Sequence, residues 1–387
     1  MNELEATISQ VIDENNISFE WGKEVLNELK HTELDLNSKR KDLTKVPFIT
    51  IDGSDAKDFD DAIHCIYSKS SFTLSVAIAD VAELVQLGTA LDDEALNRGT
   101  SIYFPSKVIP MLPEEISNNL CSLVPNQIRN VVVCEIAFSE LGEVRGYNFF
   151  EARIKSHKRM TYAEVDKFLA VGSGLESNIS NSIKSLHKLT ETLLKIRSKR
   201  GALEIESQEP ILDINLEGKV NKIILPKRLF SHQMVEESML AANVCAANFM
   251  NKHYNFGVYR IHEEPDELKL ESLKKFFSLK GFSGSFSKDP ASLIKQCLLH
   301  SKDNKLNKAL QTVVLQSLKR AEYSTEELGH FGLQLQRYSH FTSPIRRYPD
   351  LMTHRMIKNI LNNSLNTTNK DNIEEICIDM SDLERVA

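Results

Sequence analysis

Residues 48–65 read FITIDGSDAKDFDDAIHC, a stretch that joins an apolar strand-like run to a dense group of acids. Five aspartates fall within ten residues: Asp52, Asp55, Asp58, Asp60 and Asp61. Like charges this close destabilise a folded chain and raise one another's pKa. The fold therefore needs cations or several hydrogen-bond donors beside these carboxylates.

Asp and Ser favour turns, so DGSD, residues 52–55, is compatible with a simple Asx turn at a strand end. A turn explains one aspartate but not the set, and hard oxygen ligands of this kind suit Mg²⁺ or Mn²⁺. A calcium EF-hand is excluded, because the twelfth position counted from Asp52 is Ile63 rather than a glutamate. A phosphatase with an Asp nucleophile is a competing interpretation of DFD, residues 58–60, but its strand would run directly into Asp58.

The chain has 387 residues, 41% of them apolar and 26% charged, a balance typical of a globular protein with a packed core. No apolar run reaches the roughly 18 residues of a membrane span, and the acidic start is unlike a signal peptide, so we expect a cytoplasmic location without membrane partners. The six cysteines form no C-x-x-C pair, which argues against a disulfide framework or a cysteine zinc site. A net charge of -7 argues against a general nucleic-acid binder, although residues 319–358 carry seven Lys/Arg against four acids.

The spacing of apolar residues predicts a mixed α+β fold. Two short helices are expected within residues 4–30, and strands at residues 48–51, 62–67, 72–85 and 131–138 are expected to pair into one twisted sheet. A helix should begin after Thr161 as its N-cap, and another should end at Gly201. Residues 232–253 predict a deeply buried helix that carries Glu236 and Glu237.

A second stretch, HFTSPIRRYPD at residues 340–350, is suited to binding phosphate. It holds Arg346 and Arg347 in a loop restrained by Pro344 and Pro349, with Ser343 before them. The planar guanidinium binds phosphate oxygens bidentately and stabilises charge that develops on them. A solvated basic turn is the simpler interpretation of two adjacent arginines, but the flanking prolines and aromatics favour a built site.

Four blocks together resemble the catalytic RNB domain of the ribonuclease II and ribonuclease R exoribonucleases, nearer ribonuclease R: TIDGSDAKDFDDAI, IPMLPEEISNNLCSL, VEESMLAANVCAANF and HFGLQLQRYSHFTSPIRRYPDLMTHR. The resemblance implies an α+β domain in which a twisted β-sheet flanked by helices surrounds a deep channel for single-stranded RNA. It also implies a processive, Mg²⁺-dependent 3′→5′ exoribonuclease that releases nucleoside 5′-monophosphates.

Carried onto this sequence, the resemblance assigns one or two Mg²⁺ ions, with Mn²⁺ as a substitute, to Asp52, Asp58, Asp60 and Asp61. The expected catalytic residues are Asp60 and Arg346. Contacts to RNA are expected from Tyr103, Glu237, Ser343, Arg346 and Arg347.

Three of the positions implied by the resemblance concern the RNA end. Tyr103 matches an aromatic that clamps terminal nucleotides, and stacking of this kind accepts any base. Glu236 or Glu237, with Glu237 slightly favoured, matches an acid near the terminal ribose, where a carboxylate can accept from the 2′-OH. Ile205 stands where the family often carries a phenylalanine, a departure that bears on the length of the final product.

We divide the chain into a helical lead-in, residues 1–46, and a catalytic domain, residues 47–387, which we expect to be truncated at its C-terminal end because it stops inside a helical pattern. The flanking OB-fold domains of the family are not expected within it. The expected partners are single-stranded RNA and the remaining domains of a split ribonuclease R-like protein, and the chain itself is expected to be a monomer. A non-catalytic RNA-binding remnant of such a protein is the competing hypothesis.

Overall fold

A computed structural model describes residues 3–204, 211–215, 219–302, 307–365 and 368–387 of the chain. Its main feature is a six-stranded sheet in the order β1-β8-β2-β3-β4-β7, with a further pairing between β8 and β7. This last pairing closes the sheet into a ring, because β8 meets β2 along one edge and β7 along the other. The strands are β1 (Lys41–Asp42), β2 (Phe48–Asp52), β3 (Asp61–Ser68), β4 (Ser71–Ala79), β7 (Ile128–Ser139) and β8 (Val144–Thr161).

The predicted α+β class and the single twisted sheet are confirmed, but two local expectations were wrong. Residues 81–84 form the helix α3 (Val81–Leu84) instead of continuing β4, because Val81 and Leu84, three residues apart, both turn into the core. The long strand β8 was not predicted at all. Its buried side chains alternate with Arg, Lys and His on the outer face, so the stretch resembles a polar loop in sequence.

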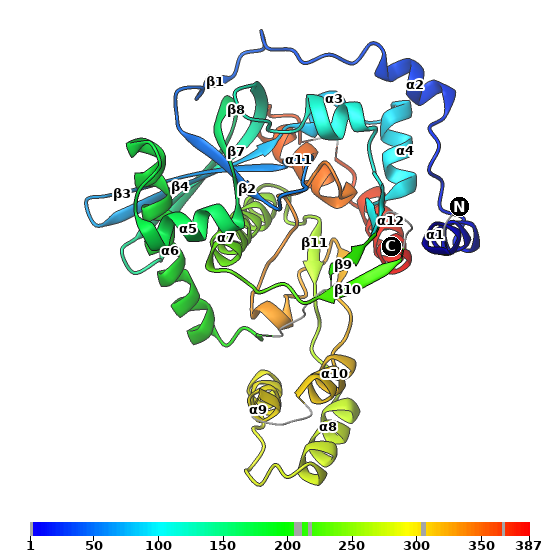
Figure 1. The fold of residues 1–387 in the computed structure, drawn as a ribbon, viewed down its shortest axis with the longest axis vertical. Coiled ribbons are helices and arrows are strands. Elements are labelled where there is room, and N and C mark those ends of the chain that lie inside the picture. The colour runs from blue at the N-terminus through cyan, green and yellow to red at the C-terminus, as the bar shows by residue number, and fades with distance from the viewer. Residues whose placement is uncertain (1–2, 205–210, 216–218, 303–306, 366–367) are drawn as a thin grey trace.

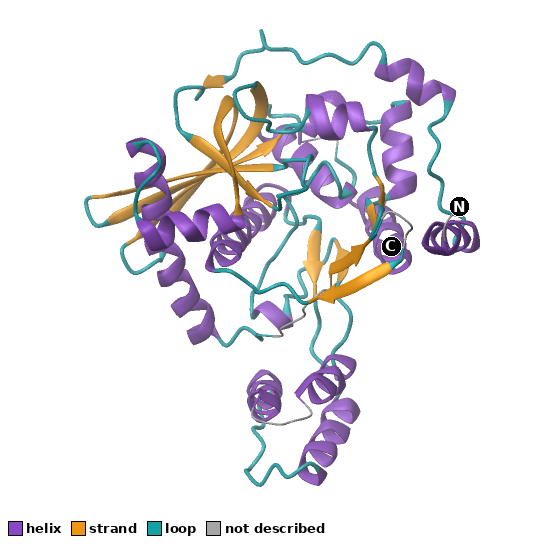
Figure 2. Ribbon diagram, in the orientation of Figure 1, coloured by secondary structure: helices purple, strands orange, loops and turns teal. Residues whose placement is uncertain are grey.

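Helices cover the barrel on several sides (Figure 1, Figure 2). The long helix α6 packs against β3 and β4, and α7 packs against β4, β7 and α11. Thr161 caps α5 as predicted, and Gly201 follows α6 in the left-handed conformation. The bounds of the helices around the barrel are α4 (Ala90–Arg98), α5 (Tyr162–Val171), α6 (Ser177–Arg200), α7 (Phe230–Tyr254), α11 (Tyr348–Leu361) and α12 (Lys370–Val386).

Three further helices form a lobe that stands apart from the barrel at the bottom of Figure 1. The lobe has its own apolar cluster, which includes Leu273, Phe277 and Ile294. Two chain segments connect it to the body, one after β11 and one before β12. The bounds are α8 (Glu267–Leu279), α9 (Pro290–Lys302), α10 (Asn307–Ser317), β11 (Tyr259–Ile261) and β12 (Glu322–Ser324).

The remaining elements are short. The predicted N-terminal helices are confirmed as α1 (Glu3–Glu14) and α2 (Lys23–Leu29). Two small hairpins lie outside the barrel, β5 (Ile102–Phe104) with β6 (Lys107–Ile109) and β9 (Ile211–Ile214) with β10 (Val220–Ile224). A π-helix, η1 (Glu115–Leu120), precedes β7, and a single 3-10 turn, η2 (Phe331–Leu333), precedes α11.

A buried group of ion pairs fixes the lead-in to the barrel. Asp80, at the end of β4, lies 2.7 Å from Arg40 Nη2 and 2.6 Å from Lys358 Nζ. Burial opposes the charge of Asp80, but Lys358 and Arg40 together hold the pKa of its carboxyl below the usual value. The contact joins the residue before β1, the end of β4 and helix α11, so it ties the lead-in and α11 to the barrel.

All six cysteines are buried and unpaired, as the sequence predicts. Among the described residues, no helix combines the length and the apolar character needed to cross a membrane.

Candidate active site

The aspartate-rich stretch forms the loop between β2 and β3. Asp52 is the last residue of β2 and Asp61 the first of β3, so the two strand ends hold both carboxylates at the same end of the barrel. These strands pair antiparallel through Ile49 and Ile63. The backbone carbonyl of Asp60 accepts a hydrogen bond of 2.9 Å from the N–H of Ala79 on the next strand. The site is therefore built on the rigid end of the sheet.

Two residues that the sequence did not point to hold the loop in shape. Arg159, on β8, donates through Nη2 to the carbonyls of Gly53 at 3.1 Å and Ser54 at 2.7 Å. Ser122 accepts from the N–H of Phe59 at 3.0 Å and donates to the carbonyl of Lys57 at 2.7 Å. Both residues bind backbone groups of the loop from segments that are distant in sequence. Only a correct prediction of β8 and of the turn before β7 would have identified Arg159 and Ser122 as supports of the site.

Asp60 is the point at which the two predicted stretches meet. Its Oδ1 accepts a hydrogen bond of 2.9 Å from the backbone N–H of Ile345, 285 residues further along the chain. Its Oδ2 lies 3.4 Å from Nε of Arg346. The side chain of Arg346 is 42% exposed, so the guanidinium reaches from the buried carboxylate toward solvent. This arrangement leaves the arginine free to bind a phosphate beside the aspartates.

Burial makes these carboxylates hard to ionise without a cation. Burial, followed by the charge of Asp58, raises the pKa of Asp52 to about 6. Burial raises the pKa of Asp60 to about 7, although Arg346 and the Ile345 N–H oppose the rise. The pKa of Asp61 is also raised, first by burial and then by Asp52. A bound cation would return all three to the charged form.

The residues present fit a hard divalent cation by their donor chemistry. Asp52 Oδ2 and Asp61 Oδ2 are buried and have no hydrogen-bond partner, an unfavourable state that metal coordination relieves. Within the described parts of the chain, no group of three or more His, Cys, Asp and Glu side chains is arranged so that it could hold a metal ion. The fit therefore rests on the two unsatisfied oxygens and on the carboxylate donors, which suit Mg²⁺, Mn²⁺ and Ca²⁺ alike.

The loop before α11 separates the roles of its two arginines. Arg346 Nη2 donates to Ser343 Oγ at 3.0 Å, which orients the guanidinium near Asp60. Arg347 instead turns inward, and its Nη2 donates to Asp350 Oδ1 at 2.8 Å. Asp350 also accepts from the N–H of Ser343 at 2.8 Å. The structure thus brings only Arg346 to the aspartates, and the predicted RNA contacts of Ser343 and Arg347 stay predictions.

Tyr103 lies beside the site, on the hairpin of β5 and β6. Its hydroxyl donates to Asp58 Oδ2 at 3.4 Å, and its side chain is more than half exposed. Burial of the hydroxyl and the charge of Asp58 raise the pKa of Tyr103 to about 12, so the ring stays neutral. Tyr103 and Val108 line a pocket of about 490 Å³ that is also lined by Asp58 and Ile345.

Glu237 has its own partner away from the aspartates. Its Oε1 accepts from Arg197 Nη1 at 2.8 Å, and the same Arg197 nitrogen contacts Glu236 at 2.6 Å. Burial raises the pKa of Glu237, and Arg197 opposes the rise. No contact found among the described residues joins Glu237 to the aspartates, so its ribose contact stays a prediction. Ile205, the other predicted position for the RNA end, lies outside the described residues.

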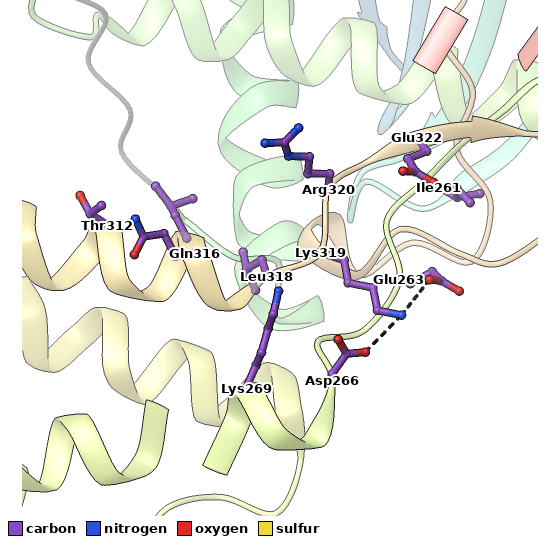
Figure 3. A pocket seen from close by; sticks show the side chains of 11 residues that line it. Ile261, Glu263, Asp266, Lys269, Thr312, Gln316, Leu318, Lys319, Arg320 and Glu322 are labelled. Atoms are coloured by element: carbon purple, nitrogen blue, oxygen red, sulfur yellow. Dashed lines mark hydrogen bonds and ion pairs between the residues drawn. The ribbon is translucent and has the colours of Figure 1, made fainter. Parts of the chain in front are cut away.

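Another pocket lies elsewhere, at the base of the helical lobe (Figure 3). It encloses about 730 Å³ between α8, the end of α10 and the segment before β12. Lys319 lines this pocket and pairs with Glu263 at 2.9 Å and Asp266 at 3.4 Å. None of the predicted site residues lines it, so we assign the chemistry to the site around Asp60.

A family profile described as RNB domain matches residues 40–363. Ribonuclease R of Vibrio parahaemolyticus is 41% identical over 360 residues, which are 90% of this chain and 43% of the relative. Ribonuclease R of Escherichia coli is 43% identical over 331 residues, 83% of this chain and 40% of the relative. The chain therefore spans less than half the length of these relatives.

Solved structures are similar to this chain over most of its length. The structure described as Mycoplasma genitalium RNase R in complex with ribose methylated single-stranded RNA aligns with a TM-score of 0.91 at 33% identity, over 98% of this chain and 62% of that one. Yeast Ssd1, described as a pseudonuclease, shares the fold with a TM-score of 0.74 at 18% identity, over 92% of this chain and 45% of that one. The resemblance found in the sequence is thus confirmed: the chain belongs to the RNB domain family.

Proposed function

We propose that the chain is a 3′→5′ exoribonuclease that hydrolyses single-stranded RNA processively to nucleoside 5′-monophosphates with the help of Mg²⁺. One observation supports this most: the buried carboxylate of Asp60 binds the Ile345 N–H and lies 3.4 Å from Arg346. The acidic loop and the arginine loop are far apart in sequence, and the buried core that contains both Phe59 and Ile345 brings them together. Their meeting provides ligands for a cation and a binding group for phosphate in one place.

In our proposal, different residues bind the cation, bind the phosphate and support the aspartate loop. Asp52, Asp58, Asp60 and Asp61 hold the cation, and Mg²⁺ bound there supplies Lewis acidity toward the phosphate and the attacking water. Arg346, oriented by Ser343, binds the phosphoryl oxygens at the scissile bond. Arg159 and Ser122 keep the aspartate loop from relaxing when its charges are neutralised or restored. Preorganisation of this kind is the largest contribution that a protein makes to such hydrolysis.

Tyr103 is assigned to the end of the RNA. Its ring is exposed, and its hydroxyl is held by Asp58, so the ring can stack on a base directly beside the carboxylates. Stacking does not depend on base identity, which suits an enzyme that removes every nucleotide in turn. In the same proposal Glu237 accepts from a ribose 2′-OH and selects RNA over DNA. Two Mycoplasma genitalium RNase R structures support RNA as the ligand, one in complex with ribose methylated single-stranded RNA and one with double-stranded RNA.

The test uses the purified chain and single-stranded RNA labelled at its 5′ end, incubated with Mg²⁺ or with EDTA. We expect a ladder that shortens from the 3′ end, nucleoside 5′-monophosphate as the released product, and no reaction in EDTA. Binding of RNA without any shortening would instead identify a non-catalytic remnant. Turnover of small phosphomonoesters with a covalent phosphate on Asp58 would identify the phosphatase alternative.

Other expectations are retained as proposals. They are a monomeric chain, a cytoplasmic location, Mn²⁺ as a substitute metal, the remaining domains of a ribonuclease R-like protein as partners, and a boundary between lead-in and catalytic domain at residue 47. The structure adds one relevant fact about this boundary: β1, residues 41–42, already pairs with β8.

A further inference from the structure

The hairpin of β5 and β6 presents two different faces. Side chains alternate along a strand, so Ile102 and Phe104 point one way and Tyr103 points the other. Across the hairpin, Ile109 stands opposite Ile102, and Val108 stands opposite Tyr103. Tyr103 and Val108 line the pocket beside Asp58, whereas the isoleucine face turns away from it.

Helix α1 covers the isoleucine face. Ile8, Ile12 and Ile109 are buried together, with 6%, 4% and 3% of their surface exposed, and Ile102 and Phe104 pack at the edge of this cluster. The cluster is separate from the main core of the barrel. Figure 1 shows α1 at the edge of the molecule, away from the barrel. The packing of α1 is therefore directed at the hairpin and not at the central core.

The segment after α1 also contacts the hairpin of β5 and β6. Lys107 Nζ, on β6, lies 4.4 Å from the ring centre of Phe19. The Arg98 guanidinium stacks 3.7 Å from the ring centre of Trp21, and its nitrogens donate to the carbonyls of Glu20 at 2.9 Å and Pro110 at 3.1 Å. Pro110 directly follows β6. Residues 3–21 thus hold the hairpin on its outer face and at its exit.

We propose that this N-terminal segment is a positioning element for Tyr103: through Ile8 and Ile12 it fixes the angle at which the Tyr103 face of the hairpin meets the aspartate site, and so sets the affinity for the RNA 3′ end. The proposal rests on the role of Tyr103 in the proposed function. A two-stranded hairpin with three residues in each strand is not stable alone, so its orientation depends on what packs behind it. In this fold α1 packs behind the hairpin, and the backbone N–H of Ser101, just before β5, donates to the carbonyl of Arg346 at 3.0 Å.

A double-mutant cycle tests the proposal. The variants are Ile12→Ala, Tyr103→Ala and the double variant, with Val11→Ala as a matched control, because Val11 lies on the same helix but is exposed. Steady-state hydrolysis of a 5′-fluorescein-labelled oligoadenylate gives kcat and KM for each protein. We expect Ile12→Ala to raise KM about fivefold without changing kcat, and to have no further effect in the Tyr103→Ala background. Ile12→Leu, which keeps the apolar contact, should restore KM, and Val11→Ala should leave it unchanged.

A purely structural role of α1 predicts different values of kcat and KM. If Ile12→Ala lowers kcat in proportion to a loss of folded protein measured by circular dichroism, with KM unchanged, the helix is only structural and the proposal is wrong. Equal effects of Ile12→Ala with and without Tyr103 would also overturn it, because α1 would then not act through that residue. If Tyr103→Ala alone leaves KM unchanged, the assigned role of Tyr103 fails, which the cycle detects separately from a failure of the α1 proposal.

Discussion

Replacing Asp60 with asparagine should stabilise the metal-free protein above neutral pH and stabilise it less in acid. Asp60 is 6% exposed, and burial raises the pKa of its carboxyl from 3.8 to about 7. Asparagine has nearly the same size and keeps an oxygen that can accept the Ile345 N–H, but it carries no charge. The cost of a buried charge is removed while the hydrogen bond remains.

Linkage gives the sign and the size of the effect. A carboxyl whose pKa is higher in the folded protein contributes its full stability below the unfolded pKa near 3.8, and this contribution is lost as the pH rises through about 7. A tenfold change in proton affinity corresponds to about 1.4 kcal/mol. The rise in the pKa of Asp60, about a thousandfold in proton affinity, therefore limits the destabilisation by its charged carboxylate to at most about 4 kcal/mol. Relaxation of the site and entry of water reduce such costs. We therefore expect Asp60→Asn to gain about 2 kcal/mol at about pH 8.

Urea unfolding in EDTA, followed by circular dichroism at about pH 5 and about pH 8, measures this difference. Asp55→Asn is the matched control, because Asp55 lies in the same loop and is exposed, so its substitution should change the free energy of unfolding little at either pH. Loss of stability on Asp60→Asn at the higher pH would show that the buried charge of Asp60 is not destabilising. The same change at both pH values would show that the effect does not come from ionisation of Asp60.

Three further predictions concern the cation and the phosphate. Arg346→Lys should lower kcat for RNA by about a hundredfold in initial-rate assays, because lysine cannot offer two parallel N–H groups to the phosphate; a rate near that of the wild type would argue against the assigned role. Mg²⁺ should raise the melting temperature more at about pH 8 than at about pH 5, since the raised pKa values of Asp52 and Asp60 leave fewer ionised ligands in acid, and equal shifts would contradict carboxylate coordination. Arg159→Ala should raise the Mg²⁺ concentration for half-maximal activity, because the carbonyls of residues 53, 54 and 56 lose their common donor, and an unchanged Mg²⁺ titration would show that the loop holds its shape without it.

Local patterns in the sequence predicted those helices and strands that depend on interactions between residues close in sequence. Thr161 is an example, because its hydroxyl accepts from the Glu164 N–H at 3.2 Å and Glu164 accepts from the Thr161 N–H at 2.7 Å, as a capping residue should. The strand that ends at Asp52 was equally clear from its apolar run. The closure of the barrel was not predictable in the same way. It depends on β8 pairing with β2 as well as with its hairpin partner β7, and no short-range pattern specifies the pairing of β8 with β2, which lies far earlier in the chain.

In the candidate site, too, some features follow from the kind of residue and others depend on contacts between distant segments. The acidic stretch indicated a cation, and the RR pair indicated phosphate binding, because each depends on the kind of residue present. The sequence could not show that Arg346 faces Asp60 while Arg347 faces Asp350, since adjacent residues of one loop can turn either way. The roles of Arg159 and Ser122 also depend on contacts between distant segments. Only the folded chain specifies which of several suitable side chains reach the site.

In the function that we propose, Asp60 and its neighbours hydrolyse RNA from the 3′ end in the presence of Mg²⁺. The most direct measurement compares wild type, Asp60→Asn and Asp55→Asn for nucleoside 5′-monophosphate release from single-stranded RNA, with RNA affinity measured in parallel by fluorescence anisotropy. We predict that Asp60→Asn abolishes release while still binding RNA, and that Asp55→Asn behaves as the wild type. Release of monophosphate by Asp60→Asn at the wild-type rate would show that Asp60 has no catalytic role.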